Sequence, residues 1–149
     1  MTELLQSARW KFPLMAVGQM QKEVTHNEAL TLIDALISPV VEANGINIAP
    51  ISPMLGQCWL VGAAPTGLWA GAAHHLACWT SGGWRLIVPR TAMLVRLVNG
   101  PMLRFDGLVW AVPAAVPNPV GGTVIDSEAR TAISALVVVL QAYGWLEQN

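Results

Sequence analysis

Apolar residues follow three different spacings along the chain. In the N-terminal part they recur three and four positions apart, which predicts a helix carrying Leu30, Ile33, Leu36, Ile37 and Val40 on one face. Between residues 46 and 117, short β-prone runs alternate with Gly, Pro, Ser and Asn, which predicts hairpins. These runs cover residues 58–61, 75–79, 84–88, 93–98, 102–105 and 108–110. Helical spacing returns after residue 126. The order predicts an α+β fold: an N-terminal helix, a central antiparallel β-meander of about five to seven strands and a C-terminal amphipathic helix.

The ends of both predicted helices carry recognisable signals. Thr25-His26-Asn27-Glu28 has the form of a capping box, in which the Thr25 hydroxyl and the Glu28 carboxylate each accept a main-chain amide of the first turn. Asp126 is a favourable N-cap for the second helix. Gly144 suits the position after its end, with Trp145 placed to fold back on Leu140 as in a Schellman motif. These signals divide the chain into three predicted segments: residues 1–45, an attachment segment and helix; residues 46–117, a Trp/Gly-rich β domain; and residues 118–149, a linker and oligomerisation helix.

The C-terminal helix has a second pattern within its helical spacing. Ala129, Ile133, Leu136, Leu140 and Tyr143 are spaced 4-3-4-3, which is the seam of a heptad repeat. Val137, Val138 and Val139 make the helix apolar nearly all round, and such a helix needs burial on more than one side. We predict an oligomer interface at Ile133, Leu136, Val137, Leu140 and Tyr143, with a trimer favoured. The alternative is that the seam docks on the protein's own sheet.

Charge and hydropathy narrow the classes of partner. Charged residues make up only 11% of the chain, whereas about 25% is typical of soluble domains, so we expect much of the surface to be covered in an assembly. The net charge of −1 and the absence of a basic patch argue against nucleic acid. No apolar run reaches the length of a membrane span, and the run from Phe12 to Val17 is too short for a secretory signal, so we expect synthesis in the cytoplasm.

Candidate chemistry is sparse. Cys58, Cys78, His74 and His75 could be drawn as a metal site, but no paired-ligand spacing is present, and we expect no metal and no cofactor. The two cysteines could pair, although reduced, buried thiols are the usual state in the cytoplasm, and we expect that state. Asp106 is the one acidic residue between residues 46 and 117, which disfavours a carboxylate-pair hydrolase. We predict no catalytic residue and no enzyme activity.

The tryptophans leave two interpretations open. Five of the seven lie in the predicted β domain, where they suit the core of a small sheet. Exposed indole rings can also stack on sugars. Trp69, Trp79 and Trp84 are the candidates for a glycan site, and we expect Trp69 to be the most exposed because it lies in a Gly-rich turn. We expect most of these rings to be core.

The most specific sequence motif in the chain lies between Phe12 and Leu30. Its key positions are Pro13, Gly18, Gln19, Gln21, Lys22, Thr25, His26, Asn27, Glu28 and Ala29. This stretch resembles the opening motif of an uncharacterised domain family of alphaproteobacterial tailed phages, prophages and gene transfer agents, and Gly/Trp positions to the C-terminus extend the similarity over the whole chain. The resemblance implies a non-enzymatic virion protein, such as a tail-fibre, spike or baseplate adaptor, that assembles with itself and with other virion proteins. A carbohydrate-binding module that recognises host surface polysaccharide is the alternative.

Overall fold

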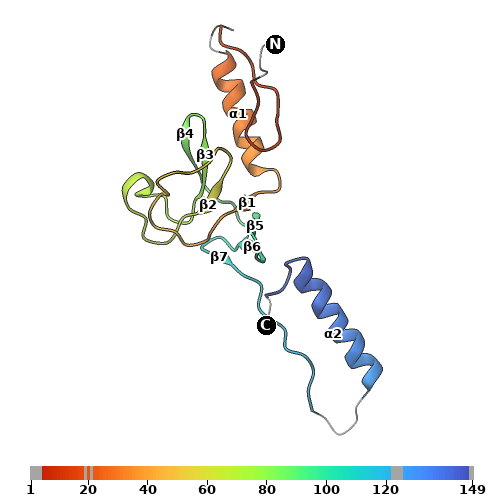
Figure 1. Ribbon diagram of the computed structural model, residues 1–149. Helices are drawn as coiled ribbons and strands as arrows, with labels where there is room; N and C mark the ends of the chain where they lie inside the picture. The colour runs from red at the N-terminus through yellow and green to blue at the C-terminus, as the bar shows by residue number, and fades with distance from the viewer. Residues whose placement is uncertain (1–4, 19, 21, 122–125, 148–149) are drawn as a thin grey trace. The chain divides into compact units, whose positions relative to one another are not determined.

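The computed structural model describes residues 5–18, 20, 22–121 and 126–147 (Figure 1). Two helices and seven short strands form an α+β fold with antiparallel pairing, which confirms the predicted fold class. The chain divides into two compact units, Met1–Pro89 and Arg90–Asn149. The boundary between the units falls inside the range 46–117, and the three segments drawn from the sequence stay a prediction.

The N-terminal unit is built on a three-stranded sheet. It contains α1 (Lys22–Leu36), β1 (Val40–Val41), β2 (Cys58–Leu60), the 3-10 turn η1 (Gly67–Trp69), β3 (Leu76–Thr80) and β4 (Gly83–Ile87). Strands β2, β3 and β4 are antiparallel neighbours in that order. Gly83 opens β4 with a φ of +92°, a value that favours glycine and makes the tight turn after Thr80 possible.

Alternation along these strands gives the sheet two different faces. The register pairs Cys58 with Cys78 and Trp79 with Trp84. Because neighbouring residues of a strand point to opposite faces, the cysteines share one face and the tryptophans share the other. Glu28 of α1 bonds to Arg85, which pairs with Cys78 and so stands on the cysteine face. The segment after β1, which hydrogen-bonds to β2, packs on the tryptophan face.

The C-terminal unit contains β5 (Leu94–Leu97), β6 (Met102–Phe105), β7 (Trp110–Ala111) and α2 (Ser127–Ala142). β5, β6 and β7 pair antiparallel in that order. Its buried side chains are Val95, Leu103, Phe105, Trp110 and Val137. Asp106 closes the turn between β6 and β7, where its carboxylate accepts the amides of Leu108 and Val109. These bonds lower the pKa of Asp106, with the Val109 amide as the largest cause.

The predicted caps of α2 are confirmed. Asp126 accepts the amide of Ala129 at 2.9 Å, which is the expected N-cap bond. Gly144 has a φ of +73°, and the amides of Gly144 and Trp145 donate to the carbonyls of Gln141 and Leu140. This pair of bonds is the Schellman motif.

The predicted capping box at Thr25 is wrong. The first helix begins at Lys22, so Thr25 and Glu28 lie inside the helix and not at its N-cap. Glu23 is the acidic residue of the first turn, and its carboxylate lies 3.5 Å from the amide of Gly18. An acidic side chain near the start of a helix is favoured by the helix dipole, which explains the earlier start. Gln19 and Gln21 of the opening motif lie outside the described residues.

The predicted apolar face of α1 is also displaced. Asp34 and Ala35 are buried, whereas Ile33, Leu36 and Ile37 remain partly exposed. The inward face is chosen by the polar bonds of Asp34 and not by the aliphatic stripe. Of the two described helices, neither is long and apolar enough to cross a bilayer.

Candidate functional site

A cluster of four tryptophans occupies one face of the three-stranded sheet. The Trp84 ring lies at its centre, with edge-on contacts to Trp59, Trp69 and Trp79 at centroid distances of 5.5, 5.0 and 5.1 Å. Edge-to-face packing at these distances is the arrangement that aromatic quadrupoles favour. The cluster is therefore a packed core element contributed by β2, η1, β3 and β4.

Trp69 is fully buried, so the expectation that it is the most exposed ring is wrong. Its 3-10 turn folds the ring inward onto Trp84 instead of displaying it. The indole N–H of Trp69 has no hydrogen-bond partner among the described residues. Trp79 and Trp84 are only partly exposed and pack against each other. None of the three glycan candidates thus offers an open ring face of the kind that sugar stacking needs.

Two other tryptophans are exposed, and the sequence analysis proposed neither of them for a glycan site. Trp10 lies in the N-terminal segment, residues 5–14, where its indole N–H donates to the carbonyl of Ile37 at 3.1 Å. Trp145 follows α2 and lines a shallow groove of about 250 Å³ with Leu94, Met102, Arg104 and Pro113. The Gly-rich context of Trp69 led to the wrong prediction that its ring is exposed, because a turn can close over its own aromatic side chain.

Helix α2 exposes most of its apolar side chains. Leu136 is 63% exposed, and Val138, Val139 and Tyr143 are comparably open. Val137, at 6% exposure, is the exception and packs inside the C-terminal unit, so its predicted place in an oligomer interface is wrong. Leu140 is half-buried, whereas Ile133 is 44% exposed.

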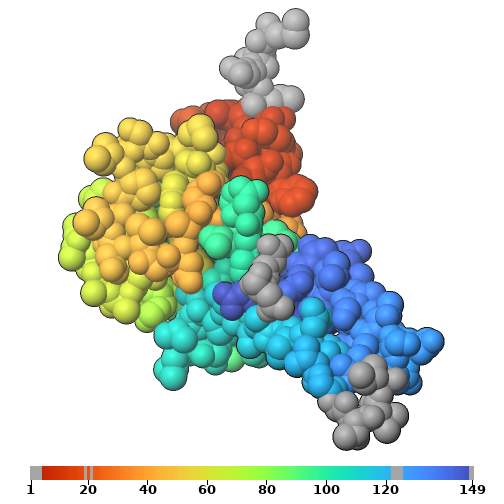
Figure 2. Space-filling view, turned by 60° about the horizontal axis from the view of Figure 1, so that its bottom comes forward, coloured from red at the N-terminus to blue at the C-terminus, as the bar shows by residue number. Residues whose placement is uncertain are grey.

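The exposed side of α2 is rotated from the predicted seam. Ala132, Ala135, Val139 and Ala142 are all exposed and recur three, four and three positions apart. Each precedes a predicted seam residue by one position, which is about 100° around the helix axis. We call the surface formed by these four residues with Leu136, Val138 and Tyr143 the outer face of α2. In the space-filling view α2 (blue) lies beside the segment that precedes it in the chain (cyan) (Figure 2). Arg130 of α2 donates hydrogen bonds to the carbonyls of Pro119 and Gly121 in this segment.

The opening motif fastens parts of the N-terminal unit to one another. The Asn27 side-chain amide bonds the main chain of Met15 in both directions, at 2.8 and 2.9 Å. Glu28 accepts two bonds from Arg85 on β4, at 2.6 and 3.0 Å. The hydrogen bonds that Arg85 donates to Glu28 raise the pKa of Arg85. A partner 57 residues away cannot be found from local spacing, which predicted a capping role for Glu28 instead.

Asp34 is a buried carboxylate with three hydrogen-bond donors. It accepts the Ser7 hydroxyl at 2.6 Å and the main-chain amides of Arg9 and Trp10 at 2.9 and 2.6 Å. All three donors belong to the N-terminal segment. A charged acceptor makes such bonds stronger than neutral ones, so Asp34 holds this segment on α1.

Cys58 and Cys78 form a disulfide, and the expectation of reduced thiols is wrong. Their Cα atoms lie 4.1 Å apart, directly opposite each other on β2 and β3. The amide of Trp79 donates to the carbonyl of Gln57, which marks the cysteines as the close, non-hydrogen-bonded kind of pair. The β register, which the sequence did not specify, brings the two sulfur atoms together.

The other candidate ligands do not gather around the cysteines. Nδ1 of His75 lies 3.0 Å from the carbonyl of Ala73, and His74 adopts a φ of +63° in the turn before β3. In the part of the chain that the structure describes, no three His, Cys, Asp or Glu side chains come close enough to hold a metal ion.

A comparison with models of protein families gives a match. A family described as "Protein of unknown function (DUF2793)" matches residues 26–111, which is more than half of the chain. No curated protein matches. The matched range covers most of α1 and all seven strands, and it ends before the linker and α2.

Proposed function

The chain belongs to the DUF2793 family, and from that premise we propose that it is a non-enzymatic structural protein whose copies associate through the outer face of α2. The single observation that carries this proposal is the exposure of an almost continuous apolar helix surface. A monomer gains nothing from such a surface, because exposed apolar patches of this kind mark interaction sites or aggregation-prone regions.

The charge distribution supports a second copy as the partner. Residues 131–146 contain no charged side chain, so two outer faces can approach without burying an unpaired charge. Ala132, Ala135 and Ala142 leave room for a close approach, and Leu136, Val139 and Tyr143 supply the apolar area. In a parallel three-helix arrangement the outer face of each copy would face the common axis, and a trimer is the expected state.

The proposed place of action is a phage or phage-like particle. This part rests on the resemblance of the opening motif, residues 12–30, to virion-associated domains. In this proposal the N-terminal unit attaches to other virion proteins and α2 holds the copies together. Mass spectrometry of purified particles tests the placement: recovery in stoichiometric amounts supports it, and recovery only from the host lysate rejects it.

A charge introduced on the outer face tests the association itself. We expect Leu136→Asp and Val139→Asp each to lower the molar mass measured by light scattering, because association would bury an unpaired carboxylate. Leu108→Asp is the matched control, since Leu108 is exposed in the β6–β7 turn of the same unit. An unchanged mass in both helix variants, or an equal fall in the control, contradicts the proposed interface.

The carbohydrate-binding alternative has no specific observation in its favour. Trp69 is closed off, and Trp79 and Trp84 are packed in the tryptophan cluster.

A further inference from the structure

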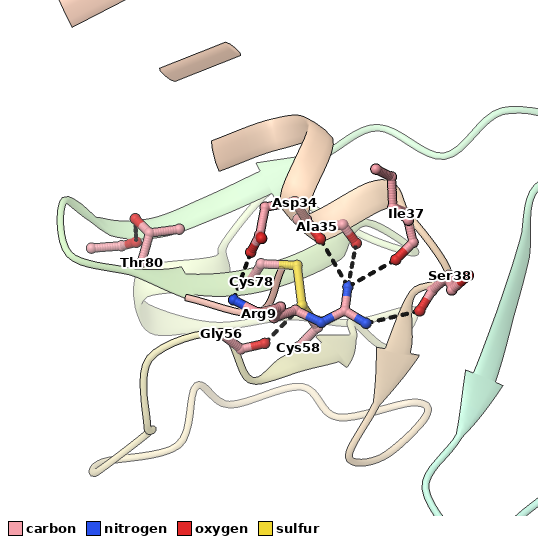
Figure 3. Close-up of a disulfide and its surroundings, with 10 residues drawn as sticks. Arg9, Asp34, Ala35, Ile37, Ser38, Gly56, Cys58, Cys78 and Thr80 are labelled. Atoms are coloured by element: carbon pink, nitrogen blue, oxygen red, sulfur yellow. Dashed lines mark hydrogen bonds between the residues drawn. A yellow bond between two sulfur atoms is a disulfide. The ribbon is translucent and has the colours of Figure 1, made fainter. Parts of the chain in front are cut away.

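The disulfide lies beneath the N-terminal segment. Cys58 and Cys78 are 0% and 1% exposed, so the sulfur atoms are closed to solvent. A small cavity of about 60 Å³ adjoins both cysteines, and residues 6–9 of the segment line it together with Asp34 and Ala35 of α1. Figure 3 shows Arg9 crossing in front of the disulfide, with the end of α1 beside it.

Arg9 fixes the segment to the C-terminal end of α1. Its guanidinium donates to four main-chain carbonyls: Asp34 at 2.9 Å, Ala35 and Ile37 at 3.2 Å, and Ser38 at 2.8 Å (Figure 3). The carbonyls of Asp34 and Ala35 are among those that the last turn of α1 leaves unpaired, and a cation is favoured there. The carbonyls of Ile37 and Ser38 follow directly after the helix. The four bonds from Arg9 and the three bonds to Asp34 are therefore the main polar contacts that hold the N-terminal segment on α1.

The segment also fits closely against the loop before β2. A Cβ added to Gly56 would lie 3.0 Å from the Cβ of Ala8 and 3.0 Å from the Cγ of Arg9. The hairpin of the segment is closed by its own bonds, from the Ser7 amide to Phe12 and from the Leu14 amide to Leu5. These two bonds join the ends of the hairpin independently of its contacts with the rest of the unit.

Polar bonds, and little apolar burial, hold the N-terminal segment in place. Ser7 is its one buried residue, whereas Leu5 and Trp10 remain exposed. The strands beneath it are buried throughout β2 and most of β3. Regions with few buried apolar contacts open at lower free energy than the core, so the segment can leave while the sheet stays folded.

We propose that the N-terminal segment is a latch that gates thiol reduction of the Cys58–Cys78 disulfide. While the latch is docked, an external thiolate cannot reach either sulfur. When the latch is released, the thiolate attacks one sulfur, forms a mixed disulfide and expels the other cysteine as a thiolate. A second thiol then resolves the mixed disulfide, so the protein gains two electrons and two protons and the reductant becomes a disulfide. The N-terminal unit thus responds to a thiol reductant only when its latch is displaced.

The test measures reduction by dithiothreitol under native conditions on the full chain. Free thiols are trapped with N-ethylmaleimide over time and counted by mass spectrometry. We expect Arg9→Ala and Asp34→Asn to be reduced about tenfold faster than wild type or more, because each loses charge-assisted bonds that hold the latch. Lys11→Ala is the matched control: it removes a cation from the same segment, whose one bond is the local contact with the Ala8 carbonyl. We expect its rate to be unchanged.

Urea unfolding of each variant separates latch release from loss of the whole fold. The proposal requires the rate of reduction to rise by more than the fall in global stability accounts for. If Arg9→Ala or Asp34→Asn does not fold, Ser7→Ala replaces it in the test, because it removes only the hydroxyl bond to Asp34. Wild-type rates in Arg9→Ala and Asp34→Asn would overturn the proposal, as would acceleration equal to that of Lys11→Ala. Reduction of the wild type as fast as that of the urea-unfolded chain would overturn it too.

Discussion

The packing of the tryptophan cluster makes a sharp prediction for Trp84. Substitution by alanine removes the ring that contacts Trp59, Trp69 and Trp79. The space left by the Trp84 ring can be filled only if the rings of Trp59, Trp69 and Trp79 change position. The N-terminal unit should lose stability, and its ordered aromatic environment should be lost with it.

The magnitude follows from the burial and the number of contacts. Replacing a buried aromatic residue by alanine costs about 3–5 kcal/mol in protein cores. Trp84 keeps part of its surface in solvent, which lowers the transfer contribution, but it makes three edge-on contacts, each worth about 0.5–1.5 kcal/mol beyond its area. We expect a loss of about 3 kcal/mol in the free energy of unfolding for Trp84→Ala, and a smaller loss for Trp84→Phe.

Urea unfolding followed by near-ultraviolet circular dichroism measures this loss. Trp145→Ala is the matched control, because the Trp145 ring is largely exposed and lies in the C-terminal unit. We expect the control to lose less than about 1 kcal/mol, as is usual for surface substitutions. A loss below about 1 kcal/mol in Trp84→Ala, or similar losses in the two variants, would refute the assignment of Trp84 as the centre of a core.

Three further predictions concern the disulfide, the ion pair between Glu28 and Arg85, and the turn at Asp106. Replacing Cys58 and Cys78 together by alanine should lower the free energy of unfolding by about 3 kcal/mol, as measured in urea, because the disulfide closes a loop of moderate length. A double-mutant cycle on Glu28 and Arg85 should give a coupling below about 1 kcal/mol that weakens with salt, since both side chains are partly exposed. Asp106 has a folded-state pKa below its ordinary value near 3.8, so its contribution to stability should be present above that pH and disappear as the pH falls through the folded-state pKa; Asp106→Asn should abolish this part of the pH dependence in acid titrations.

The strands could be predicted from the sequence because their signals are local. The predicted runs 58–61, 75–79, 84–88 and 102–105 correspond to β2, β3, β4 and β6 within one residue at each end. Glycines at the turns and β-prone residues between them carry this information within a few positions. The caps of α2 were predictable for the same reason, since Asp126 and Gly144 act on their immediate neighbours.

The disulfide and the inward face of α1 were missed because they depend on contacts between distant residues. The disulfide requires the β2–β3 register, which pairs Cys58 with Cys78. The inward face of α1 is set by Asp34, whose donors lie more than twenty residues earlier in the chain. A buried carboxylate on a helix reads as a solvent-exposed position in a hydropathy pattern, so the pattern selected the wrong face of α1.

The heptad spacing in α2 predicts an apolar line along the helix, but it does not determine which side of the helix is exposed. Spacing alone permits a seam through Ile133 and Leu140, or one through Ala132 and Val139. The burial of Val137 within the C-terminal unit decides between them, because it turns the first line partly inward and the second outward. Only the packing of the helix in its own unit supplies this choice.

The molar mass of the full chain in solution tests the central claim most directly. Sedimentation equilibrium over a dilution series should give a multiple of the 15.9 kDa chain mass, with three copies as the expected state. A mass of one chain that persists to high concentration would show that the outer face of α2 stays exposed, and it would contradict the claim that association covers this surface.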